Sequence, residues 1–187
     1  MDTKNPTLPP GLADLNVEFY YRDGNIFILH NGQNIPFEDV PVEILDKVRK
    51  QMDHDPIAMA SLALLKIDDP VDQLKKFIEC RYGDFNMEPD IDTRGRENPE
   101  YFECGIRGTC PVEGKLCNSI MAPYGTITKR EADIIKLVVQ DLADKEIAER
   151  LNISYNTVTS HRSRITQKIG AASKVGIARF ALEKNII

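Results

Sequence analysis

The sequence predicts a mixed fold with a small α+β domain, a cysteine-rich irregular segment and an all-α domain of four helices, in that order. Three observations predict it. Residues 16–30 alternate as two β-strands around an Asp-Gly turn, all four cysteines lie within positions 80–117, and residues 128–187 place apolar side chains at helical spacing. A length of 187 residues accommodates two small domains and a connecting segment.

The boundaries follow from these changes of pattern. We expect a flexible arm over 1–14, a small α+β domain over 15–82, a cysteine-rich segment over 83–125 and a helical domain over 126–187. The first ten residues are polar and rich in proline, no stretch resembles a signal peptide, and no apolar run has the length of a membrane span. We therefore expect a cytoplasmic protein without a membrane partner.

The α+β domain begins with a β-hairpin. Residues 16–21 and 26–30 are rich in β-formers, and Asp23-Gly24 between them is a strong signal for a tight hairpin turn. A second turn at 31–34 leads to a short third strand over 35–37. A sheet with so few strands is not stable alone. We therefore expect the helices that follow to cover one of its faces.

Three helices are predicted after the strands. The first starts near Pro41 and runs to about Met52. The second and third open at Asp55-Pro56 and Asp69-Pro70, where an aspartate caps the helix and proline occupies its first turn. We expect the third helix to run to about Tyr82 and to bury Val71, Leu74, Phe77 and Ile78.

Four short amphipathic helices are predicted in the C-terminal domain. Thr128 and Glu131 have the spacing of a capping box and open the first helix. A second helix starts near Asp144, a third runs from Tyr155 to about Ile169 behind the N-cap Ser154, and a fourth follows Ser173 to about Lys184. The very short connection between the second and third helices predicts a helix-turn-helix.

The third of these helices has two different faces. Val158, Ile165 and Ile169 form an apolar stripe, and hydroxyl, amide and basic side chains cover the rest. From Asn152 through Leu182 there are five Lys or Arg and no Asp or Glu. A merely solvated helix face usually mixes charges of both signs, so this face is typical of one that meets the grooves and phosphates of DNA.

The C-terminal part of the sequence resembles a known family. Residues 127–187 are similar to the C-terminal DNA-binding domain of LuxR/GerE-type transcriptional regulators. The resemblance rests on Thr128–Glu131, Lys145–Ala148, Leu151–Ser154, Thr157-Val158, His161, Ile165, Lys168–Gly170 and Ile186-Ile187. It implies a domain of four helices whose third helix enters the major groove and whose fourth helix often supplies a dimer contact.

The resemblance implies double-stranded DNA as the partner and a homodimer formed through the fourth helix. The residues expected to contact DNA are Lys145, Tyr155, Asn156, Thr157, Thr159, Ser160, Arg162, Ser163, Arg164 and Lys168. The family commonly has a basic residue directly after Thr-Val, and this chain has Thr159. Its target preference is therefore expected to depend on Thr159, Ser160 and Ser163. Asp141 and Asn185 stand where glycine is usual.

The charge is divided unevenly along the chain. Residues 126–187 hold 11 Lys and Arg against 7 Asp and Glu, a net charge of +4, while residues 1–125 hold 13 against 22, a net charge of −9. An acidic body attached to a basic head is expected of a regulator in which only the head meets nucleic acid.

The cysteine-rich segment predicts a metal site. Cys80, Cys104, Cys110 and Cys117 are separated by 23, 5 and 6 residues and lie among glycines and prolines. Four thiolates bind Zn²⁺ tetrahedrally, and the metal would order a segment that has no periodicity of its own. A [4Fe-4S] cluster is the alternative, because the wide spacing of these cysteines and the Cys110-Pro111 dipeptide are compatible with such a cluster. Four unrelated thiols are the third interpretation.

No arrangement of residues for catalysis stands out, so we expect a protein that is not an enzyme. The leading interpretation is a sequence-specific DNA-binding transcriptional regulator with a metal site in its connecting segment. The alternative is a metal-stabilised accessory module whose helix-turn-helix docks on RNA polymerase or another protein. Steep salt dependence of duplex binding would distinguish the two.

Overall fold

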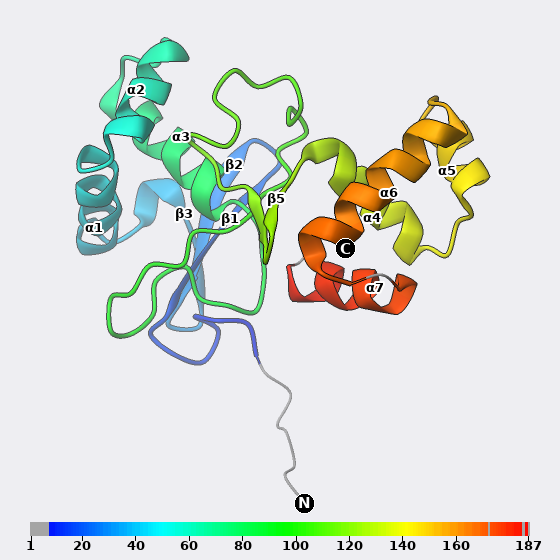
Figure 1. Cartoon of the computed structure of the whole chain (residues 1–187). Coiled ribbons are helices and arrows are strands. Elements are labelled where there is room, and N and C mark those ends of the chain that lie inside the picture. Colours follow the sequence, from blue (N-terminus) through cyan, green and yellow to red (C-terminus); the bar gives the residue numbers. More distant parts are fainter. Residues whose placement is uncertain (1–7, 172, 185, 187) are drawn as a thin grey trace, which may run out of the picture. The chain divides into compact units, whose positions relative to one another are not determined.

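The computed structural model describes residues 8–171, 173–184 and 186. The chain divides into two compact units, Met1–Asn118 and Ser119–Ile187 (Figure 1). Within the described residues, no helix combines the length and the apolar composition that a membrane crossing requires. The described residues contain both helices and strands, as the sequence predicts.

The first unit begins with a three-stranded antiparallel sheet in the order β1-β2-β3. Its strands are β1 (Val17–Arg22), β2 (Asn25–His30) and β3 (Gln33–Pro36). Arg22 pairs with Asn25 across the Asp23-Gly24 turn, in which both residues have positive φ, 50° and 84°. That is the backbone of a primed two-residue hairpin turn, so the predicted hairpin and its Asp-Gly turn are confirmed.

Residues of the predicted arm split into two groups. Residues 1–7 lie outside the described part of the chain. Residues 8–14 are hydrogen-bonded to the turn between β2 and β3: Gly32 N–H donates to the Gly11 carbonyl at 2.8 Å and Asn31 N–H to the Asp14 carbonyl at 3.1 Å. This second group is therefore held by main-chain hydrogen bonds.

A 3₁₀ turn and three helices follow the sheet: η1 (Phe37–Asp39), α1 (Val42–Asp53), α2 (Pro56–Leu64) and α3 (Pro70–Tyr82). The two aspartate caps form as predicted. The Asp55 carboxylate accepts from the N–H groups of Ile57 and Ala58, and the Asp69 carboxylate accepts from those of Val71 and Asp72. Each satisfies backbone donors at a helix start that has no intrahelical partners.

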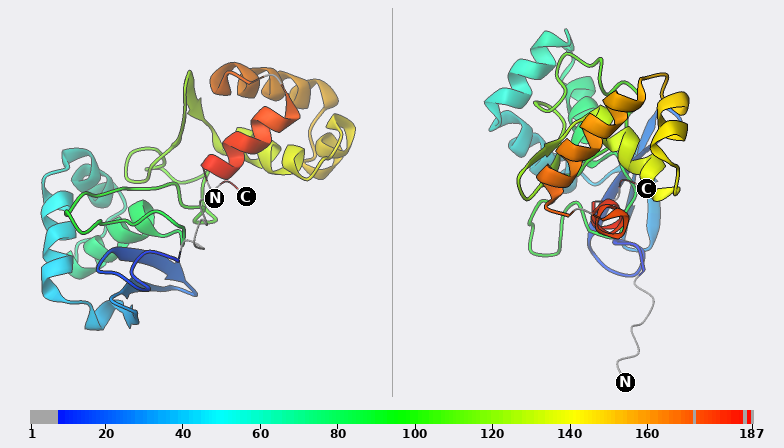
Figure 2. Two further views of the ribbon diagram at one scale, coloured as in Figure 1. Left: turned by 90° about the horizontal axis from the view of Figure 1, so that it is seen from below. Right: turned by 45° about the vertical axis from the view of Figure 1, so that its right-hand side comes forward.

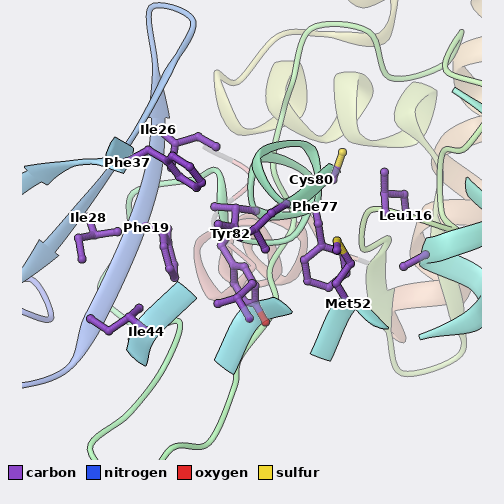
Figure 3. Packing of buried hydrophobic residues seen from close by; sticks show 14 of the residues in the cluster. Phe19, Ile26, Ile28, Phe37, Ile44, Met52, Phe77, Cys80, Tyr82 and Leu116 are labelled. Atoms are coloured by element: carbon purple, nitrogen blue, oxygen red, sulfur yellow. The ribbon is translucent and has the colours of Figure 1, made fainter. Parts of the chain in front are cut away.

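The core of the first unit lies between the sheet and these helices. Phe19 and Ile28 on the sheet meet Phe77 and Tyr82 of α3, all of them fully buried (Figure 3). Figure 2 shows α3 lying across the sheet, where it packs on β1. The prediction that Val71 is buried is wrong, since it is 45% exposed. It lies in the first turn of α3, ahead of the part that faces the sheet.

Residues 83–100, here called the strap, follow α3 and lie along β1. Tyr21 N–H donates to the Gly83 carbonyl at 2.9 Å, and Val17 exchanges two main-chain hydrogen bonds with Ile91, at 2.9 and 3.1 Å. Phe85 packs edge-on against Tyr20, with ring centroids 5.4 Å apart. The strap therefore satisfies backbone donors on the edge of β1 that β2 leaves open.

Residues 101–118 have no regular structure and are held by two arginines. The Arg107 side chain is 2% exposed, lies 4.0 Å over the Tyr101 ring and donates to the carbonyls of Phe102 (2.6 Å) and Asn118 (2.9 Å). Arg81 of α3 donates to the Leu116 carbonyl at 2.6 Å and to Asp55 at 2.6 Å. Guanidinium groups thus supply donors to carbonyl groups that no strand or helix satisfies.

The second unit begins with a hairpin, β4 (Ile120–Ala122) and β5 (Gly125–Ile127), that the sequence did not predict. Three-residue strands are too short for a visible alternation, so the expected all-α domain is corrected to helices plus this hairpin. The predicted helices are confirmed: α4 (Lys129–Val139), α5 (Asp144–Arg150), α6 (Tyr155–Ile169) and α7 (Lys174–Glu183). Asn185, predicted to act in a left-handed cap, lies outside the described residues.

Candidate nucleic-acid interface

Helices α5 and α6 form the predicted helix-turn-helix. The connection over residues 151–154 is short because Asn152 adopts a left-handed conformation, with φ of 51°. The Ser154 hydroxyl then caps α6 by accepting from Thr157 N–H at 3.1 Å. Ile134 of α4, Ile147 of α5, and Val158 and Ile165 of α6 are fully buried. The direction of α6 is thereby fixed by packing on both preceding helices.

The exposed face of α6 is polar. Asn156, Ser160, Ser163 and Gln167 follow one another at helical spacing and are all exposed, whereas the buried residues lie on the opposite side. Thr159 and Arg164 flank this stripe and are also exposed. A helix face of this kind offers hydroxyl and amide groups to base edges and a guanidinium to phosphates or guanine.

Seven of the ten predicted DNA-contact residues are exposed and three are partly buried. The exposed residues are Lys145, Tyr155, Asn156, Thr159, Ser160, Ser163 and Arg164. Tyr155 is 51% exposed, and with Lys145 it lines a shallow surface hollow at the start of α6. The partly buried residues, Thr157, Arg162 and Lys168, each have a partner inside the unit.

Thr157 belongs to the helix cap. Its hydroxyl lies 2.8 Å from the Ser154 hydroxyl, in addition to the hydrogen bond that its N–H donates there. Arg162 forms an ion pair with Asp144 at 2.5 Å, and both side chains are less than a quarter exposed. This pair connects the middle of α6 to the first turn of α5, so Arg162 fixes the angle of the helix-turn-helix.

Lys168 is bound to a buried carboxylate. Its ammonium group donates to both oxygens of Glu131, at 2.8 and 2.7 Å, and Glu131 is 2% exposed. Glu131 is also the acidic member of the capping box of α4 and accepts from Thr128 N–H at 2.8 Å. Burial opposes ionisation of this carboxyl, but the hydrogen bonds from Lys168 and Thr128 outweigh it and lower its pKa.

Asp144 and Glu131 are the residues that sequence reasoning missed as parts of this interface. They lie 18 and 37 positions from their basic partners, and local helical spacing relates only residues three or four apart. Glu131 was assigned to the capping box alone. The three-dimensional structure adds the contact that joins this box to the end of α6.

The four cysteines gather in the first unit. Cys80 on α3 and Cys117 are buried, Cys104 and Cys110 are half-buried, and all four are free thiols. Burial raises the pKa of Cys80 to about 12, Lys76 opposes this, and Glu79, Cys117 and Cys104 raise it further. Cys110 packs against the same core, and Cys117 accepts from Gly114 N–H at 3.4 Å. Among the residues that the structure describes, no three His, Cys, Asp or Glu side chains are arranged to hold a metal ion.

Comparison with known proteins identifies the second unit. The family model for GerE, described as bacterial regulatory proteins of the luxR family, matches residues 125–181. These residues are a luxR-family GerE domain. The matched segment begins in the β4–β5 hairpin and includes the whole helix-turn-helix, so the resemblance stated from the sequence is confirmed.

Relatives of the GerE domain are found in staphylococci. A segment of 74 residues, 40% of this chain, is 36% identical to the oxygen regulatory protein NreC of Staphylococcus carnosus strain TM300 and covers 34% of that protein. A segment of 65 residues, 35% of this chain, is 37% identical to NreC of Staphylococcus aureus strain JH9 and covers 30% of it. The similarity thus spans about a third of the length of these relatives.

Proposed function

We propose that this protein is a sequence-specific DNA-binding transcriptional regulator that places α6 in the major groove. The main support for the proposal is the exposed polar stripe of α6. The Ser154 cap and the buried residues of α4 and α5 hold this helix in place, so the stripe has a fixed orientation. The luxR-family match over residues 125–181 supports it. The relatives are named as oxygen regulatory proteins, and from that name we carry over only the regulatory role.

The residues of the stripe have distinct roles in this proposal. Thr159, Ser160 and Ser163 read base edges, since their hydroxyls donate and accept hydrogen bonds. Arg164, Lys145 and the exposed polar groups of Tyr155 and Asn156 contact phosphates. Lys168 and Arg162 act mainly within the domain, where each is bound to a carboxylate.

The proposal is tested by selecting preferred duplexes from a random pool and measuring affinity as a function of salt. Arg164→Ala should weaken binding to all duplexes and reduce the salt slope by about 1. Ser163→Ala should instead change the ranking of sequences. Arg22→Ala in the first unit is the control, since Arg22 lies outside the GerE domain and its side chain is 76% exposed. Absence of duplex binding at physiological salt would favour a module that docks on RNA polymerase or another protein.

We also propose that the regulator is a homodimer formed through α7. Val175 and Leu182 are 79% and 68% exposed and lie seven residues apart on one side of this helix. A second copy would cover both in a two-fold interface. Val175→Asp with Leu182→Asp should abolish the dimer in sedimentation experiments, and Leu64→Asp, at a similarly exposed position of α2, should not.

A Zn²⁺ ion bound by Cys80, Cys104, Cys110 and Cys117 is part of this proposal, with a [4Fe-4S] cluster as the alternative. What supports it is the donor set: Cys80, Cys110 and Cys117 pack in or against one core, and Cys104 acts electrostatically on Cys80. Binding would require the thiols to reorient and lose their protons. Elemental analysis and an absorption spectrum of protein purified without oxygen would decide. About one zinc per chain supports the proposal, and iron with acid-labile sulfide supports the alternative.

A further inference from the structure

Two fully buried acidic side chains lie where the strap crosses β1. Glu18 is the second residue of β1 and Asp90 is in the strap, and both are 0% exposed. Acidic residues are rarely buried completely unless a partner neutralises them. The pair is separate from the GerE domain and from the four cysteines.

Each carboxyl group uses one oxygen to bind the strap to the strand. The Asp90 Oδ2 atom accepts from Phe19 N–H at 2.6 Å, which satisfies a donor on the open edge of β1. The Glu18 Oε1 atom accepts from Asn86 N–H at 2.8 Å. The second oxygens, Asp90 Oδ1 and Glu18 Oε2, are buried and have no hydrogen-bond partner among the described residues.

The charged groups that act most strongly on the pair are also acidic. Asp84 and Glu100 both disfavour ionisation of Asp90, and Asp84 does so for Glu18. Arg81 of α3 binds Asp55 and Arg96 of the strap binds Asp92, while Arg94, the other arginine of the strap, is exposed. On α3, the Tyr82 hydroxyl donates to Gln51, so it is not a donor to the pair.

The ionisation of these groups is shifted accordingly. Burial raises the pKa of Glu18 to about 8, although N–H groups of Asn86 and Asp90 oppose the shift. Burial, reinforced by Glu18 and Glu100, raises the pKa of Asp90 well above its usual value. Burial and then Asp84 raise the pKa of Glu100 to about 9.

We propose that Glu18 and Asp90 share one proton between their two otherwise unpartnered oxygens and so form a pH-sensitive latch that holds the strap on β1. One carboxyl is protonated, its O–H donates to the carboxylate of the other, and the pair carries a single negative charge. Loss of the proton to solvent leaves two buried negative charges facing each other. The strap is then expected to leave the edge of β1.

The direction of the pH effect follows from the raised pKa values. An acid whose pKa is higher in the folded than in the unfolded chain stabilises the fold most below its unfolded pKa, about 4.5 for glutamate, and this stabilisation is lost as pH rises toward about 8. Ordinary carboxylates have the opposite effect. The latch is therefore closed in mildly acidic and neutral solution and opens in alkaline solution.

Hydrogen exchange and thermal unfolding of the full chain between pH 5 and 9 test the latch. In the wild type, the protection factors of Phe19 and Asn86 N–H should fall by about tenfold or more between pH 6 and 9. Asp90→Asn and Glu18→Gln replace the shared proton with an amide N–H, so each should keep this protection at pH 9. Asp92→Asn is the control: the pKa of Asp92 is lowered, first by the Arg96 N–H, so this variant should keep the wild-type decline.

Two results would overturn the latch. If Asp90→Asn and Glu18→Gln lose protection in parallel with the wild type, the pair does not control the strap. If millimolar Ca²⁺ raises the unfolding temperature of the wild type but not of Glu18→Gln, the cluster holds a metal ion in place of a proton. Should Asp90→Asn fail to fold, the Glu18→Gln variant and the ¹³C carboxyl titration of Glu18 in the wild type give the same decision.

Discussion

Lys168 shows how one residue can match a family pattern and still have a role that the pattern does not reveal. Its position near the end of a basic helix predicts contact with phosphate. Its ammonium group instead neutralises Glu131, a buried carboxylate that also caps α4. A buried carboxylate that loses its cation is strongly destabilising, so we regard Lys168 as a residue that maintains the GerE domain.

Replacing Lys168 with methionine should therefore lower stability before it affects DNA contacts. We expect a loss of about 2 kcal/mol in the free energy of unfolding at pH 7, less than for a fully buried pair because Lys168 is partly exposed. Lys174→Met removes an exposed ion pair with Asp141 and should lower the stability much less than Lys168→Met does. Equal losses in urea unfolding of the two variants would contradict this role.

The backbone conformation of Asp141 is expected to lower the stability of the GerE domain. Its φ is 64°, in the left-handed region that glycine occupies without strain. Asp141→Gly should stabilise the domain by about 0.5–1 kcal/mol, even though the exposed ion pair with Lys174 is lost. Asp141→Ala keeps the strained backbone and should be less stable than the glycine variant. A glycine variant that melts below the wild type would contradict the argument.

At the scale of elements, the segment 101–118 is ordered by side chains and not by regular structure. Arg107 occupies its centre, stacks on Tyr101 and donates to carbonyls at both ends of the segment. The sequence interpretation assigned this ordering to a metal. The hydrogen bonds of Arg107 can order the segment without a metal. The two explanations predict different results when Arg107 is replaced or a chelator is added.

Arg107→Met should expose the segment. The stem of the side chain is kept, but two part-buried carbonyl groups lose their donors, which costs about 1 kcal/mol for each group. We expect faster proteolysis and hydrogen exchange over residues 101–118. Arg94→Met, an exposed strap residue, serves as the control. If chelator opens the segment of the wild type as much as this substitution does, then a metal is its main support.

The sequence predicts the structure of α6 but not that of the strap. Helix α6 was predicted with its cap, its end and its buried face, because Ser154, Gly170 and the spacing of Val158 and Ile165 are local signals. The strap gave no period. Its order depends on β1, more than 60 positions earlier: Phe19 N–H donates to Asp90, 71 positions away, and Asn86 N–H donates to Glu18, 68 positions away.

At the scale of the whole molecule, the uneven charge should affect how the protein binds DNA in its proposed function. The GerE unit is basic, with a net charge of +4, and the first unit carries −9. Phosphates repel the acidic unit and attract the basic one, and salt at 0.1 M screens both effects beyond about 10 Å. The acidic unit should therefore limit binding to unrelated sequences.

A fragment of residues 119–187 should bind an unrelated duplex about tenfold more tightly than the full chain at about 0.05 M salt. Screening should make the two affinities similar above about 0.3 M salt. Fluorescence anisotropy with a labelled duplex measures both. Adding residues 1–118 as a separate fragment is the control and should not restore the weaker binding. A constant ratio of affinities at all salt concentrations would exclude a charge effect.

The sequence by itself determined the helix-turn-helix, the caps at Thr128, Asp55, Asp69 and Ser154, and the hairpin turn at Asp23-Gly24. Each depends on residues within a few positions of one another, so local propensity and spacing are sufficient. Only the tertiary structure decided that Lys168 binds Glu131, that Arg107 organises the cysteine-rich segment and that Glu18 of β1 and Asp90 of the strap are both fully buried. Lys168 lies 37 positions from Glu131, and Asp90 lies 71 positions from the Phe19 N–H that it binds, so no local spacing relates them. Arg107 binds main-chain carbonyl groups 5 and 11 positions away, and main-chain groups carry no side-chain signal in the sequence.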